Sequence, residues 1–166
     1  MVNILIRWLV FVHVLAALTF FLAHGTSAAM AFQIRKETDF ARIRAMLDLS
    51  WSTMVLMGVS FLIMGLTGIT LPFLIRIWNR GYIWLSIVLM LFVFIYMAMF
   101  NESRYKQVRR LVGLPYMKGS KNLPAEPPSS PEEVAALLKK TSATSLVVVG
   151  YVIPAIVLWL MIFKPF

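Results

Sequence analysis

The chain has 166 residues, of which 60% are hydrophobic, and its formal net charge is +9 at pH 7. An ordinary soluble domain is only about 45–50% apolar, so this composition predicts a membrane protein, organised as one domain over residues 1–166. The chain contains no cysteine. This excludes disulfides, thiolate zinc or iron–sulfur sites, c-type haem attachment and cysteine nucleophiles.

Four stretches of the chain contain no Asp, Glu, Lys or Arg. A bilayer core about 30 Å thick needs roughly 20 apolar residues in a helix, and a helix satisfies its own backbone where no water is present. The sequence therefore predicts an all-α protein, a four-span antiparallel transmembrane helix bundle with short amphipathic cytoplasmic helices. The predicted spans are residues 8–34, 49–75, 81–101 and 141–163. The first run is longer than the apolar core of a signal peptide, about 7–15 residues, so we expect it to be retained.

The first span carries both histidines of the chain, His13 and His24. Eleven residues make about three helical turns, so the two share a face roughly 16 Å apart along the axis. Small residues follow each histidine three and four positions later, which is the room that a flat macrocycle beside a ligating imidazole needs. The alternative is structural: the same small residues form a surface for close helix contacts, and each histidine bonds to a neighbouring span.

After the first span, residues 38–47 place apolar side chains at helical spacing, which predicts a short interfacial helix; a plain turn is the alternative. In the second span, Met54, Met57 and Met64 form one stripe. Thioethers can hold Cu(I), but methionine also fills gaps in apolar packing, which we favour here. Gly58, Gly65 and Gly68 favour close helix contacts in this span.

A tight turn over residues 76–81 makes the second and third spans neighbours, and the tryptophans around it are typical of a membrane interface. The third span is expected to continue as a basic helix to a stop at Gly113. In the polar connection 102–140, Ser130 and Pro131 begin a short helix that ends at Lys140. Because such a helix is marginal alone, we expect it to dock on the bundle or on a partner. Pro154 should kink the fourth span.

The basic residues are distributed unevenly between the two sides. Twelve of the 16 Lys and Arg fall in the first and third connections, and four fall on the other side. Cytoplasmic loops carry such an excess, so the sequence predicts a bacterial cytoplasmic (inner) membrane protein with both termini outside. The basic face should meet anionic lipid headgroups. A nucleic-acid partner is not expected, because the basic residues are not interleaved with stacking aromatics.

No catalytic motif stands out in the sequence. There is no phosphate-binding glycine loop, no HExxH and no Gly-x-Ser-x-Gly, and the carboxylates lie in polar connections. With no charge in any span, an ion pathway is not expected either. We therefore interpret the chain as a non-enzyme.

The segments Val12–Ala17 and Ala23–Gly25, the turn Arg80–Trp84 and the ending Trp159–Phe166 resemble those of small four-helix bacterial integral membrane proteins. These are loosely related to the membrane domain of copper-resistance protein D, and similar forms occur among green non-sulfur bacteria. The resemblance implies a four-helix bundle and copper or haem handling at His13 and His24. Relatives in copper resistance usually have more histidines than this chain.

Two functional hypotheses follow. The first is a structural or accessory subunit of a larger bioenergetic (photosynthetic or respiratory) membrane complex, with other membrane protein subunits as partners. The second is a haem- or copper-handling protein that uses His13 and His24. We favour the first, because intramembrane histidines without other polar residues around them are expected to be structural.

Overall fold

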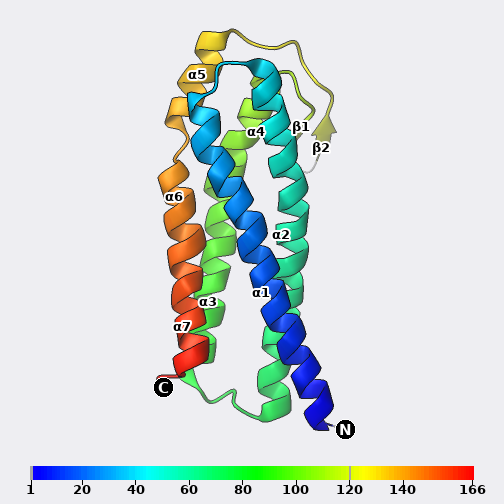
Figure 1. Ribbon diagram of the computed structural model, residues 1–166, viewed down its shortest axis with the longest axis vertical. Coiled ribbons are helices and arrows are strands. Elements are labelled where there is room, and N and C mark those ends of the chain that lie inside the picture. The colour runs from blue at the N-terminus through cyan, green and yellow to red at the C-terminus, as the bar shows by residue number, and fades with distance from the viewer. Residues whose placement is uncertain (1, 120) are drawn as a thin grey trace.

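The computed structural model describes residues 2–119 and 121–166, and of residues 2 and 100–103 it describes the backbone alone. Residues 1 and 120 of the expected single domain lie outside the described residues. Four long helices stand side by side along the long axis of the molecule (Figure 1), and each is long and apolar enough to cross a membrane. They are α1 (Val2–Gln33); α2 (Phe40–Ile75); α3 (Gly81–Tyr96), continued by the π-helical η2 (Met97–Asn101) and by α4 (Glu102–Leu111); and α6 (Ala143–Val147), continued by the π-helical η3 (Val148–Val152) and by α7 (Ile153–Phe163).

The remaining elements are short and lie at one end of the molecule. They are the 3-10 helix η1 (Ile34–Lys36), the antiparallel strands β1 (Tyr116–Lys118) and β2 (Lys121–Leu123), and α5 (Pro131–Lys140). We call this end the loop end. The opposite end, where residues 76–80 connect α2 to α3 and where the two termini lie, is the turn end (Figure 1).

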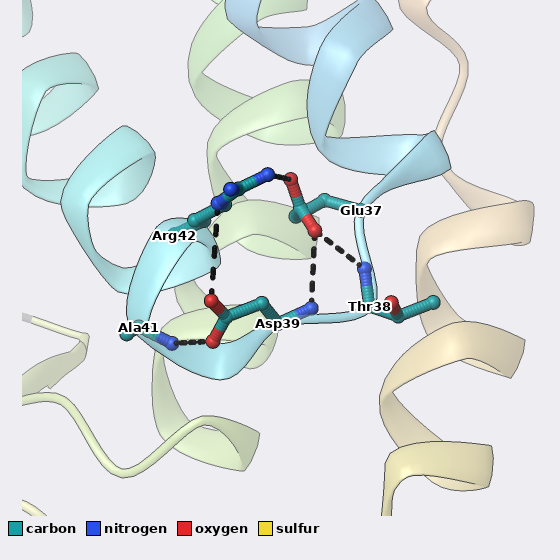
Figure 2. A network of polar contacts seen from close by, with 5 residues as sticks. All are labelled: Glu37, Thr38, Asp39, Ala41 and Arg42. Carbon is teal, nitrogen blue, oxygen red and sulfur yellow. Dashed lines mark hydrogen bonds and ion pairs between the residues drawn. The ribbon is translucent and has the colours of Figure 1, made fainter.

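The expected separate interfacial helix over residues 38–47 is wrong, because residues 40–47 belong to α2, which runs unbroken from Phe40 to Ile75. Asp39 caps its start by accepting a hydrogen bond from the Ala41 amide at 2.8 Å, and residues 40–57 contain no glycine or proline that would end a helix. Glu37 closes the preceding turn by accepting from the amides of Thr38 and Asp39 (Figure 2). The hydrogen bonds from these two backbone amides hold the pKa of the Glu37 carboxyl below its ordinary value.

The loop end has its own hydrophobic cluster, to which every neighbouring segment contributes. Val134 and Leu138 of α5 pack there, so the docking expected for this helix takes place on the chain itself. The start of α5 agrees with the sequence prediction, since Ser130 accepts a hydrogen bond from the Glu133 amide at 3.3 Å. The helix ends at Lys140, also as predicted. The buried members of the cluster are Ile34, Ile43, Leu47, Val108, Val112, Val134 and Leu138.

The third long helix continues past Arg109 and Arg110, as the sequence predicts. The chain then turns at Gly113, whose positive φ of 75° favours glycine. The two-stranded hairpin that follows was not predicted from the sequence. Glu126 then packs back against the end of α4: it accepts from Arg110 Nε at 2.8 Å and from the Tyr116 hydroxyl.

The fourth long helix changes its winding in the middle. The π-helical turn η3 lies between α6 and α7, and Pro154 is the second residue of α7. Proline gives no amide hydrogen to the preceding turn, and a π-bulge is one of the known causes of irregularity in a helix. The sequence predicts a kink at Pro154. Nothing in the sequence indicates the five π-helical residues Val148–Val152 that precede α7.

Candidate functional site: the histidines and the interhelical cavity

His13 bonds to α2. Its Nδ1 lies 2.9 Å from Thr67 Oγ1, and the Thr67 hydroxyl donates its own hydrogen to the Ile63 carbonyl at 2.7 Å. The hydroxyl therefore accepts from His13, which places the imidazole proton on Nδ1. The ring also lies against Gly68, where an added Cβ would be 3.0 Å from His13 Cε1. Gly68 is thus what lets the imidazole approach α2.

His24 bonds to the fourth long helix. It is 2% exposed, and its Nε2 donates to the Leu146 carbonyl at 3.3 Å. The ring is stacked on Phe20 (4° between the planes) and has Tyr151 beside it, with ring centroids 5.0 Å apart. An added Cβ at Gly150, within the π-helical turn, would overlap this ring. The two histidines therefore carry their protons on different nitrogens and contact different helices.

Most of the small residues beside the histidines are covered by neighbouring protein. Ala16 and Ala28 are 6% and 5% exposed, and Ser27 lies 2.9 Å from Thr53 Oγ1 of α2. α1 runs obliquely across the molecule from α2 towards α6 (Figure 1), so its small residues meet neighbouring helices. Protein thus fills the room foreseen for a flat macrocycle at Ala16 and Ala28, whereas Ser27 and His24 border a cavity.

A cavity of about 240 Å³ lies between the long helices, from the middle of the molecule to the loop end. His24 is part of its wall. The rest is mostly apolar, and thioethers are frequent: five methionines line it, contributed by α1, α2 and η2. They are Met30, Met46, Met54, Met57 and Met97.

The three methionines of the stripe in the second span differ in whether they reach the cavity. Met54 and Met57 line the cavity together with His24, whereas Met64 is not among the lining residues. Met97 and Met99 point to different sides of their helix: Met97 lines the cavity and Met99 is 63% exposed.

Two cations lie where the cavity reaches the loop end, Lys106 and Arg109. Arg109 is firmly held: its Nη1 donates to the Leu47 carbonyl at 3.0 Å and its Nε to the Pro115 carbonyl at 3.1 Å. Its Nη2 lies 2.9 Å from Asp48 Oδ1, and its guanidinium lies 5.2 Å from the Trp51 ring centre. Sequence reasoning had treated Arg109 only as one of many basic residues, because nothing in the sequence pairs it with Asp48.

The close helix contacts expected at the three glycines of α2 are not all present in the structure. Only Gly68 makes a close interhelical contact. An added Cβ at Gly58 or at Gly65 would meet nothing within 4 Å, so these two glycines do not mediate helix packing within the chain. Gly58 instead lies on the cavity wall and is exposed.

Within residues 2–119 and 121–166, no group of three or more His, Cys, Asp or Glu side chains is placed to hold a metal ion. No family model, no curated protein and no solved structure matches the chain. The resemblance to four-helix relatives of copper-resistance protein D therefore stays a prediction, and the function has to be argued from the chain's own geometry.

Proposed function

We propose that the protein is a non-catalytic, multi-pass protein of the bacterial cytoplasmic membrane and a structural or accessory subunit of a larger bioenergetic complex, photosynthetic or respiratory. In this proposal the four long helices form an antiparallel transmembrane bundle, and the helices of the loop end are cytoplasmic. One observation carries it: the turn-end half of α1 is covered by the chain along one edge only.

That edge is a narrow stripe at helical spacing. Ile6, Leu9 and His13 are partly covered, and the last of these bonds to α2. On both sides of the stripe, large apolar side chains are exposed over more than four turns. They are Ile4, Leu5, Trp8, Val10, Phe11, Val12, Val14, Leu15, Leu18 and Leu22. Lipid alone can cover such a surface. The length of the exposed surface of α1, and its position at the edge of the bundle, also suit contact with the helices of a neighbouring subunit.

The polar groups inside the bundle favour a non-catalytic role. His13, His24, Ser27 and Thr67 are all bonded to another helix or to their own backbone. A catalytic centre needs groups that are free to bind substrate or to transfer protons to it. The bonds described here instead tie α1 to both of its neighbours, which is what a scaffold requires.

Site-specific photo-crosslinking in the native membrane tests this proposal. A benzoylphenylalanine at Phe11, on the uncovered side of α1, is expected to cross-link to another polypeptide. The matched control is the same probe at Ile162, an exposed position (64%) at the turn end of α7. Native mass spectrometry of the gently extracted complex then identifies the partner. A monomer or homodimer, with no cross-link to another protein at either position, contradicts the proposal.

The alternative is haem or copper handling at His13 and His24. The observation that favours it is the shared cavity of His24, Met54 and Met57, since imidazole and thioether are ligands of Cu(I). His13 does not line this cavity, so such a site would depend on His24 and on the methionines. Copper or haem that co-purifies with the protein and is lost in His24→Ala but kept in His13→Ala would support this alternative.

A further inference from the structure

The cavity runs lengthwise between the helices. Its lining extends along α1 from Phe20 to Ile34 and along α2 from Met46 to Phe61. At 1.5 Å per residue, either stretch covers about 20 Å along the helix axis, which is more than half of a bilayer core about 30 Å thick. The lining is thus long enough for a hydrocarbon chain to lie along it.

The chemistry of its wall matches a hydrocarbon. Apart from His24, Ser27, Ser50, Tyr105 and the cations Lys106 and Arg109, the lining is built of apolar and thioether residues. At the end away from the loops, Phe61 of α2 and Phe94 of α3 stack with their ring centres 5.1 Å apart. This pair bridges the two helices and closes the cavity there.

The cavity opens sideways between α2 and the third long helix. Gly58, Phe94 and Ala98 line it and are also exposed on the outside of the molecule. The missing side chain of Gly58 enlarges this opening, since an added Cβ meets nothing within 4 Å. If the helices span a bilayer, the opening faces lipid, and a chain can enter from the bilayer without crossing water.

The charge at the loop end selects the headgroup. Lys106 and Arg109 lie where the lining ends, and no Asp or Glu is found among the described lining residues. Arg109 is held there by two backbone carbonyls and by Asp48, and Lys106 precedes it by three residues on α4. Although Asp48 already pairs with Arg109, an anionic group at this level lies beside two cations in a partly water-excluded site and gains from their field, whereas a neutral headgroup does not.

We propose that this cavity binds one acyl chain of an anionic lipid, with the headgroup at Lys106 and Arg109. The site depends neither on a partner subunit nor on a metal. It therefore stands or falls separately from the accessory-subunit proposal.

Lipid retention by purified protein tests the proposal. The full chain is extracted in mild detergent, and bound lipid is counted by native mass spectrometry and identified by liquid chromatography–mass spectrometry. We expect one tightly held lipid, enriched in anionic species relative to the membrane extract. Gly58→Leu, which places a side chain in the opening, should lose it. Gly65→Leu is the matched control, because Gly65 is equally open and on the same helix but does not line the cavity.

Charge reversal tests the headgroup and leaves the apolar part of the cavity wall unchanged. Lys106→Glu should abolish the preference for anionic lipid, while Lys139→Glu, at the exposed end of α5, should keep it. The proposal is wrong if the retained molecule is a neutral isoprenoid compound, haem or copper. It is also wrong if Gly58→Leu retains as much lipid as Gly65→Leu, or if neither co-purified nor added anionic lipid binds wild type above the level of Gly58→Leu.

Discussion

At the scale of single residues, each histidine is paired with a glycine of another helix. His13 lies against Gly68 of α2, and His24 lies against Gly150 in the π-helical turn. Each histidine side chain of α1 thus fills the space between two helices and forms a hydrogen bond there, and the glycine on the opposing helix leaves room for the imidazole ring. The functional meaning of His13 and His24 therefore has to be tested together with these glycines.

Gly150→Ala is expected to destabilise the protein by about 1–3 kcal/mol, the usual effect of overpacking, because the new methyl group overlaps the His24 ring. Gly65→Ala, where the space is open, should be neutral or slightly stabilising, since alanine favours helix over glycine. Chemical unfolding in detergent, followed by circular dichroism, measures both.

The double variant with His24→Ala identifies the cause. If the ring is the obstacle, Gly150→Ala should cost much less in the His24→Ala background, so the two changes are not additive. Strict additivity would show that the π-helical turn itself, rather than the imidazole, requires glycine.

Thr67→Val removes the acceptor for His13 Nδ1 and keeps the shape of the side chain. Hydrogen bonds between helices in membrane proteins average about 0.6 kcal/mol, so we expect a loss of that order. Thr70→Val is the control, because the Thr70 hydroxyl bonds only to the Leu66 carbonyl of its own helix. Equal losses in the two variants would contradict a contribution from the α1–α2 bond.

The Glu126 carboxyl gives the loop end a pH-dependent contact. The hydrogen bonds from Tyr116 and then from Arg110 lower its pKa in the folded state. Stability from such a group is present above the unfolded pKa, about 4.3 for glutamate, and is lost as the pH falls through the folded value. Protection against hydrogen exchange at residues 114–119 and 121–126, relative to the intrinsic rate at each pH, should therefore fall below about pH 4. Glu126→Gln should exchange quickly at neutral pH too and lose this dependence.

At the scale of elements, the sequence predicted what depends on local signals. The four apolar runs, the continuation of the third helix past Arg110 and the capped start of α5 at Ser130 are all present in the structure. The errors arose where tertiary contacts decide. Residues 40–47 lengthen α2 because Ile43 and Leu47 are buried in the loop-end cluster, and Gly58 borders a cavity that no local pattern reveals.

Docking of α5 is the element-scale feature most open to test. Leu138 is 2% exposed within the loop-end cluster, so Leu138→Ala should cost about 2–5 kcal/mol of local stability. A ten-residue helix does not persist alone in water, so α5 should then open and trypsin should cleave at Lys139 and Lys140 much faster. Glu132→Ala, on the exposed side of the same helix, should leave the cleavage rate unchanged; comparable acceleration there would contradict the docking.

At the scale of the whole molecule, the positions of the charges and of the cavity have to be read together. The basic excess lies at the loop end, and so do Lys106 and Arg109 of the cavity. The positive-inside rule predicts that this end lies in the cytoplasm. If this is correct, the lipid of the proposed site comes from the cytoplasmic leaflet, which carries the anionic surface potential.

The orientation is directly measurable, because the chain has no cysteine and single cysteines report without background. Ala125→Cys lies in the exposed proline-rich stretch of the loop end, and Asn79→Cys lies in the exposed connection at the turn end. An impermeant maleimide on intact cells is expected to label the second and not the first, and permeabilisation should expose both. The reverse pattern would place the basic residues outside. The cavity would then open to the leaflet with less anionic lipid, and the argument that selects its headgroup would lose its support even if an acyl chain still bound.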